Sequence, residues 1–204
     1  MNGFTGGAVA LAAARLAAAP SAGAAAPPLA QLGVPAGFHV SIYNNGRDLM
    51  GDDVPSDTLN RVGRMGENFG YPYCHAGDVP DPKYGKGHLC SNFAQPALRL
   101  GAHVASLGIR FYVGRMFPAN DDRAIFIAEH GSWSRSSKVG YRVAVVHVGE
   151  DGKVTGSAPF LAGFLDDQKT LGRAADMQPL RDGSLLVSDD YDGAIYRVTY
   201  SGSA

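Results

Sequence analysis

The sequence predicts an all-β fold of short strands joined by turns. Glycine (27 residues) and proline (12 residues) are frequent in the 204-residue chain, and both residue types favour turns over long regular elements. Runs of β-branched and aromatic side chains, such as residues 124–128 and 141–146, are typical of strands. With 45% apolar residues, the chain can build one domain with a core, or one domain and a leader.

Residues 1–27 are rich in alanine and glycine and precede the predicted domain. A short apolar run at residues 8–14 and small residues at 21–26 are typical of a secretory signal peptide, which predicts a periplasmic or secreted protein. Because no Lys or Arg precedes this run and Arg15 follows it directly, a disordered Ala-rich leader is the alternative. The run is shorter than the roughly 20 apolar residues of a membrane span, so no transmembrane helix is expected.

A weak internal repeat in the second half of the chain indicates the kind of β fold. Residues 124–130 and 140–143 correspond to residues 183–190 and 194–198: an apolar strand ends in polar residues, and the next strand carries an aromatic residue, Arg and Val. The offset of about 60 residues is near the period of propeller blades that carry loops. A β-sandwich is the alternative on periodicity alone.

The predicted organisation follows the chain in order. Residues 28–43 form a linker and a first strand, and residues 44–204 form an incomplete β-propeller domain with a long loop at residues 74–90. Open sheet edges can pair with another chain, so self-association is an expected interaction. The net charge is −1 and no run of basic residues exceeds two, so nucleic-acid partners are not expected.

Cys74 and Cys90 are the only cysteines in the chain. In an exported protein they are expected to pair, and closing a loop of this length contributes about 3 kcal/mol in the chain-entropy model. Unpaired structural thiols are the alternative. The spacings C-x-x-C and C-x-x-C-H are absent, so neither a metal site nor a haem site is predicted at Cys74.

Several separated motifs carry a resemblance to a known family. They include Asn-Gly-Arg-Asp at 45–48, Asn-Phe-Gly-Tyr-Pro-Tyr-Cys at 68–74, Phe-Ile-Ala-Glu-His-Gly-Ser-Trp at 126–133 and Asp-Gly-Ser-Leu-Leu-Val-Ser-Asp-Asp at 182–190. In this order they resemble the soluble quinoprotein glucose/sorbosone dehydrogenases, from about Asn45 to Tyr200. The resemblance implies a six-bladed propeller with four-stranded blades, which oxidises a sugar by hydride transfer to pyrroloquinoline quinone (PQQ) beside a bound calcium ion.

The resemblance also implies that part of the family's propeller is missing. Six blades of about 40 to 50 residues need more residues than this chain has, and the segment after Tyr43 resembles a late blade. We therefore expect the C-terminal blades, with the early and middle blades absent between Tyr43 and Asn44. Because the family's catalytic histidine lies on an early blade, the chain alone is expected to be inactive as a dehydrogenase.

The resemblance assigns roles to five residues of this sequence. Arg173 is expected to bind a carboxylate of PQQ, since a guanidinium pairs with carboxylates through two parallel hydrogen bonds. Arg135 and Lys138 are the two candidates for the basic group beside the quinone oxygen. Gly46 and Arg47 are expected to offer backbone carbonyls to calcium, which prefers oxygen ligands. The alternatives are a structural salt bridge for Arg173 and an ordinary turn at Gly46.

Other polar residues receive structural roles or remain open. Asp52, Asp53 and Asp57 either form a second calcium site or, as the favoured interpretation, an exposed acidic loop. His103 and His130 are expected to be structural. The pair Asp189–Asp190 is expected to cap a turn through side-chain hydrogen bonds.

Two other function classes compete with the incomplete dehydrogenase. One is a propeller-derived binding or assembly module that completes its ring by association. The other is a calcium-dependent lactonase-like hydrolase, a fold analogy that needs inward carboxylates.

Overall fold

The computed structural model describes residues 40–121 and 123–202. These residues form β-strands, irregular loops and two short 3₁₀ helices, η2 (Cys90–Asn92) and η3 (Ala119–Asp121). The all-β prediction is therefore confirmed. The predicted leader at residues 1–27 lies outside the described residues, and no helix within the described part is long and apolar enough to cross a membrane.

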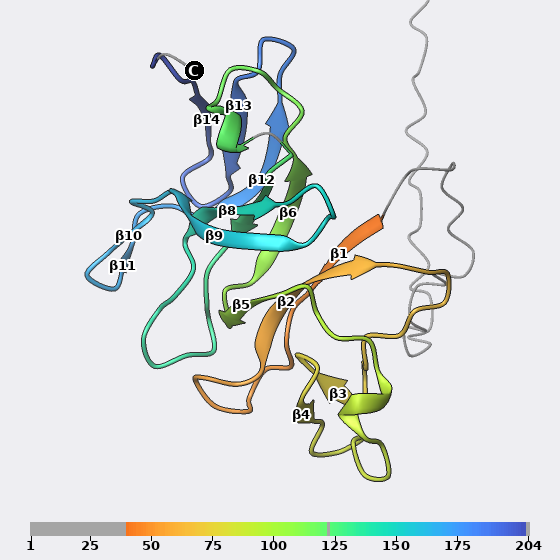
Figure 1. The fold of residues 1–204 in the computed structure, drawn as a ribbon. Helices are drawn as coiled ribbons and strands as arrows, with labels where there is room; N and C mark the ends of the chain where they lie inside the picture. Colours follow the sequence, from red (N-terminus) through yellow and green to blue (C-terminus); the bar gives the residue numbers. More distant parts are fainter. Residues whose placement is uncertain (1–39, 122, 203–204) are drawn as a thin grey trace, which may run out of the picture.

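Three antiparallel sheets make up most of the structure (Figure 1). The first sheet has the order β1-β2-β5, with β1 (Val40–Asn44), β2 (Ser56–Val62) and β5 (Leu98–Ala102). The second has the order β6-β7-β8-β9, with β6 (Ser106–Phe111), β7 (Ile125–Glu129), β8 (Arg142–Val148) and β9 (Val154–Leu161). The third has the order β12-β13-β14, with β12 (Ala174–Pro179), β13 (Leu185–Asp189) and β14 (Ala194–Val198).

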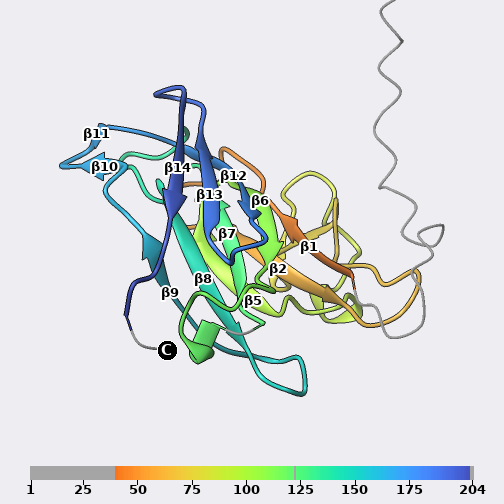
Figure 2. The same ribbon diagram turned by 90° about the horizontal axis from the view of Figure 1, so that it is seen from above.

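Each sheet is one blade of a partial propeller, and the second blade lies between the other two (Figure 2). The burial of β7 shows why its sequence is apolar throughout. Ile125 and Ile127 pack toward Leu59 of the first blade, whereas Phe126 belongs to the larger core that includes Leu185 of the third blade. Since both faces of this strand are buried, a continuous apolar run replaces the polar alternation of a half-exposed strand.

The internal repeat corresponds to equivalent strands of two blades. Strands β7 and β8 form a register from Glu129 opposite Arg142 to Ile125 opposite Val146, and β13 and β14 pair in the same antiparallel sense. The partial propeller predicted from this repeat is confirmed.

The strand registers place one set of connections on a common edge, which we call the loop rim. Asn44 at the end of β1 pairs with Thr58 near the start of β2, and Ser56 pairs with Ala102 at the end of β5. The registers of the second and third blades place their corresponding strand ends on the same edge. The loop rim therefore consists of residues 45–55, 103–105, 130–141, 162–173 and 190–193. Figure 1 shows its longer loops, orange, teal and blue, projecting on the left side.

The direction of β1 shows which strand of the first blade it is. Strands β6 and β12, the first of their blades, start at the loop rim and lie against each other, whereas β7 and β13 end there. Strand β1 also ends at the loop rim, and it lies against β6 as β7 lies against β12. Strand β1 is therefore a second strand, and no first strand of its blade occurs within residues 40–121 and 123–202.

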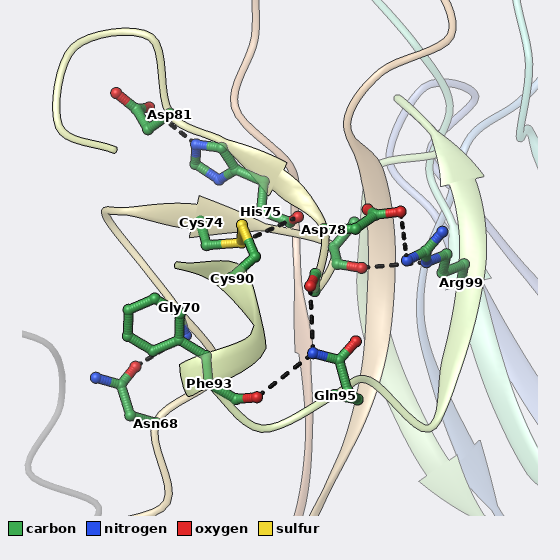
Figure 3. The surroundings of a disulfide bond; sticks show 12 residues. Asn68, Gly70, Cys74, His75, Asp78, Asp81, Cys90, Phe93, Gln95 and Arg99 are labelled. Atoms are coloured by element: carbon green, nitrogen blue, oxygen red, sulfur yellow. Dashed lines mark hydrogen bonds and ion pairs between the residues drawn. A yellow bond between two sulfur atoms is a disulfide. The ribbon is translucent and has the colours of Figure 1, made fainter. Parts of the chain in front are cut away.

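A disulfide-bonded insertion connects β2 to β5 across residues 63–97 (Figure 3). Cys74 and Cys90 are bonded, with their Cα atoms 5.5 Å apart, so the predicted pairing is confirmed. The insertion contains the short pair β3 (Cys74–His75) and β4 (Val79–Pro80). A second short pair, β10 (Leu165–Asp166) and β11 (Lys169–Thr170), lies on the loop rim.

Candidate functional site

The loop after β1 places Gly46 and Arg47 on the loop rim, where the sequence predicts calcium-binding carbonyls. The Gly46 N–H donates to Asp57 Oδ1 at 2.6 Å. A Cβ at Gly46 would lie 2.8 Å from the Pro55 carbonyl oxygen, so this close approach requires glycine. Neither the Gly46 nor the Arg47 carbonyl accepts a hydrogen bond from another described residue. Within the part of the chain that the structure describes, these two carbonyl oxygens therefore have no protein donor.

The Arg47 side chain pairs with the insertion. Its Nη1 lies 2.7 Å from Asp81 Oδ2, which also lies 2.9 Å from His75 Nε2. Burial raises the pKa of Asp81, but hydrogen bonds from His75, from Arg47 and from two backbone N–H groups outweigh it and hold that pKa well below its usual range. The Arg47 side chain thus binds the insertion, whereas the Arg47 carbonyl has no donor among the described residues.

Arg135 connects the loop after β7 to the loop after β1. Its Nη1 donates to the Asp52 carbonyl, and its Nη2 lies 3.1 Å from Asp53 Oδ1. The adjacent Ser136 N–H donates to the Asp52 carboxylate and lowers the pKa of that carboxyl group. The Arg135 Nε is buried and has no hydrogen-bond partner among the described residues. A buried N–H of a cation without an acceptor is costly to the folded state.

Arg173 holds the loop after β7 from the third blade. Its Nε donates to the His130 carbonyl at 3.0 Å, and its Nη2 donates to the Gly131 carbonyl at 2.7 Å. The guanidinium also lies over the ring of Tyr141, 5.4 Å from its centroid. Within the described structure Arg173 forms no ion pair with a carboxylate, so the alternative of a structural salt bridge is not what the geometry shows.

Lys138 lies on the same loop as Arg135. Its Nζ donates to the Thr170 hydroxyl at 3.0 Å. The structure thus brings Arg135, Lys138 and Arg173 to one rim with the Gly46 loop, although each cation also has a partner within the protein.

Asp189 confirms the expected turn cap. Its Oδ1 accepts the N–H groups of Arg173, Tyr191 and Asp192 at 2.9, 3.0 and 3.1 Å. Burial raises the pKa of Asp189, and these backbone donors more than offset that effect, so the pKa is lowered. The neighbouring Asp190 lies 2.8 Å from His130 Nε2, which gives that histidine a structural partner.

The acidic loop differs from its prediction at one residue. Asp52 and Asp53 contact the loop after β7, but Asp57 is 2% exposed and belongs to β2. The residues next to Asp57 in the sequence do not predict this burial, because the two backbone N–H groups that donate to its carboxylate belong to Gly46 and to Ala105 in another loop. Burial raises the pKa of Asp57, an effect that these two hydrogen bonds oppose.

The sequence also gave no indication that the carboxylate of Glu129 is buried. Its Oε2 accepts a hydrogen bond from Arg142 Nε at 2.5 Å. Burial raises the pKa of Glu129, and Arg142 opposes that rise. No group of three or more His, Cys, Asp or Glu side chains suited to a metal occurs in the described residues. Nothing in this part of the chain therefore favours the carboxylate-rich site of a lactonase-like hydrolase.

Comparisons with known proteins agree with this architecture. A family model described as TrAA12-like matches residues 39–201. An uncharacterized protein of Borreliella burgdorferi is 38% identical over 169 residues, which are 81% of this chain and 45% of that protein.

Solved structures of low sequence identity share the fold. A calcium structure of the Trichoderma reesei Carbohydrate-Active Enzymes Family AA12 protein matches with a TM-score of 0.66 and 24% identity, covering 78% of this chain and 48% of that one. The holo form of the pyranose dehydrogenase PQQ domain from Coprinopsis cinerea matches with a TM-score of 0.60 and 20% identity, covering 79% and 51%. The chain spans about half the length of these proteins. Because the family model covers most of its residues, the chain belongs to the TrAA12-like family.

Proposed function

We propose that the loop rim binds PQQ together with calcium, as part of a PQQ-dependent sugar dehydrogenase site. The observation that carries this proposal is that three basic side chains, Arg135, Lys138 and Arg173, lie on one rim with the Gly46 loop. The carboxylates of PQQ are suitable acceptors for guanidinium and ammonium groups. Two structural neighbours, a calcium structure of a family AA12 protein and the holo form of a PQQ domain, support the same pair of ligands.

The residues of this chain have separate tasks in the proposed site. Arg135, Lys138 and Arg173 would supply positive charge toward the carboxylates of PQQ, and the Gly46 and Arg47 carbonyls would hold calcium, a hard cation that prefers oxygen. When bound, PQQ supplies the acceptor for hydride removed from a sugar carbon. The protein's contribution at this rim is binding and orientation.

We further propose that the chain alone does not turn over a sugar. The chain spans about half the length of the relatives that it matches, and the resemblance places the family's catalytic histidine on an early blade that this chain is expected to lack. Hydride transfer needs a base held in productive geometry. The family's base would then be supplied by other blades.

Binding can be followed through Trp133, the single tryptophan of the chain, which is 70% exposed on the loop that carries Arg135. Titrating the protein with PQQ in the presence of calcium is expected to quench this fluorescence. Arg135→Lys keeps the charge but removes the Nε donor and the guanidinium, so the Kd is expected to rise at least about tenfold. A dye-reduction assay with glucose on the same samples is expected to show no turnover.

Arg181→Lys is the matched control, because Arg181 is an exposed arginine on the opposite edge of the third blade. It is expected to bind PQQ as the unmodified chain does. Equal loss in both variants would show that the loss does not depend on the position of the arginine and would contradict the assigned site. Turnover of glucose by the chain alone would contradict the proposed inactivity.

A second candidate function is an assembly module. It is favoured by the first blade, which has no first strand within the described residues. Within the described residues β1 pairs with β2 alone, so one edge of β1 has free backbone groups next to β6. Such an edge can accept an added strand. Light scattering over a range of concentrations is then expected to give a mass at least twice the 21.3 kDa of one chain. A stable monomer at all concentrations would contradict this function.

A further inference from the structure

The short turn between β5 and β6 lies at the centre of the loop rim. His103 and Ala105 both have positive φ values, 62° and 53°, although neither is glycine. Such backbone conformations are unfavourable for residues with a Cβ and persist where surrounding contacts hold them in place. The turn therefore has contacts that compensate for its conformation.

Two of these contacts reach the loop that carries Gly46. The buried Asp57 carboxylate joins the Ala105 N–H, at 2.7 Å from Oδ2, to the Gly46 N–H, at 2.6 Å from Oδ1. His103 is 8% exposed, and its Nε2 lies 2.7 Å from the Gly51 carbonyl oxygen. Since a carbonyl only accepts, His103 Nε2 donates this hydrogen bond, and the other ring nitrogen, Nδ1, lies 3.6 Å from Asp48 Oδ1.

Two further contacts connect the turn to the loop after β7. The Gly131 N–H donates to the Val104 carbonyl, and the His130 N–H donates to the Ala105 carbonyl, both at 3.0 Å. The carbonyls of His130 and Gly131 are the ones that Arg173 holds. One turn thus fixes the Gly46 loop and the loop of the basic residues relative to each other.

We propose that Asp57 and His103 are positioning residues for the loop at residues 45–55, whose Gly46 and Arg47 carbonyls are the proposed calcium ligands. This inference rests on the proposed function, because it concerns the same carbonyls. Asp57 orients the peptide that precedes the Gly46 carbonyl, and His103 fixes the far part of the loop at Gly51. Groups that orient metal ligands in this way typically change metal affinity by about 10- to 100-fold when they are altered.

The test is calorimetric titration of the full chain with calcium chloride, after chelator treatment and without PQQ. Asp57→Asn keeps the size of the side chain but leaves one acceptor for two N–H groups, so calcium affinity is expected to fall at least about tenfold. Asp189→Asn is the matched control, since Asp189 is equally buried and also accepts backbone N–H groups, but none from the Gly46 loop. It is expected to change calcium affinity less than about twofold.

A second pair of variants addresses His103 and keeps the test decisive if Asp57→Asn does not fold. His103→Ala removes the donor to Gly51 and is expected to weaken calcium binding, whereas His103→Gln retains an N–H donor and is expected to restore most of it. If the unmodified chain binds calcium and neither Asp57→Asn nor His103→Ala weakens it, the positioning role is wrong and the metal loop stands. If the unmodified chain binds no calcium, the calcium site of the proposed function is wrong, and the positioning role is wrong with it.

Discussion

Replacing Phe126 with alanine is expected to lower the free energy of unfolding by about 3–5 kcal/mol, the usual cost of truncating a buried aromatic side chain. Phe126 is fully buried in β7, between the second and third blades. Its ring centroid lies 4.5 Å from that of Phe160 and 5.7 Å from that of Tyr112. Phe117 lies 6.1 Å away as well, so four rings meet at this position, and close packing leaves little freedom to refill the cavity left by alanine.

Urea denaturation measures this loss, and Phe111→Ala is the control. Phe111 lies in the neighbouring strand β6 but is 46% exposed, so its truncation is expected to cost about 1 kcal/mol or less. Equal losses in the two variants would show that the contact between the second and third blades does not determine stability.

Removing the disulfide is expected to lower the free energy of unfolding by about 3 kcal/mol, because the bond closes a loop with a sequence separation of 16. The insertion that it closes has few strands of its own and covers the side of β2 that carries Thr58 and Asn60, both buried. The double variant Cys74→Ala, Cys90→Ala is compared with the unmodified chain by urea denaturation, with and without a thiol reductant.

The reductant provides the internal control for this prediction. It is expected to destabilise the unmodified chain by about the amount that the double variant loses, and to leave the double variant unchanged. Amide hydrogen exchange is expected to accelerate within residues 75–89, while β7 stays protected in buffer without denaturant. An unmodified chain that keeps its stability after full reduction would contradict the role of the bond.

Local patterns predicted the elements but not their neighbours. The run at 124–128 predicted a strand, and the repeat predicted equivalent strands in two blades; both depend on local runs of apolar, β-branched and aromatic side chains. The two cysteines predicted their own pairing because no other partner exists in the chain. By contrast, Asp57 stood among acidic residues of a turn-rich segment, and nothing nearby distinguished it from Asp52.

The candidate site divides in the same way. The residue types of Arg135, Lys138 and Arg173 made them candidates for an anionic cofactor through a family resemblance, since guanidinium and ammonium groups pair with carboxylates. Hydrogen-bond partners up to 83 residues away in the chain decide which of these groups keeps an unpaired donor. Only the folded structure shows that the Arg135 Nε has no partner among the described residues.

The sequence by itself determined the all-β class and the repeat and predicted the disulfide, because each depends on composition or on spacing along the chain. Tertiary structure alone decided that the loops after β1 and β7 meet at one turn, and that β1 takes the place of a second strand in its blade. Strand direction and contact between distant loops follow from how the blades pack, and no local pattern of side chains encodes them.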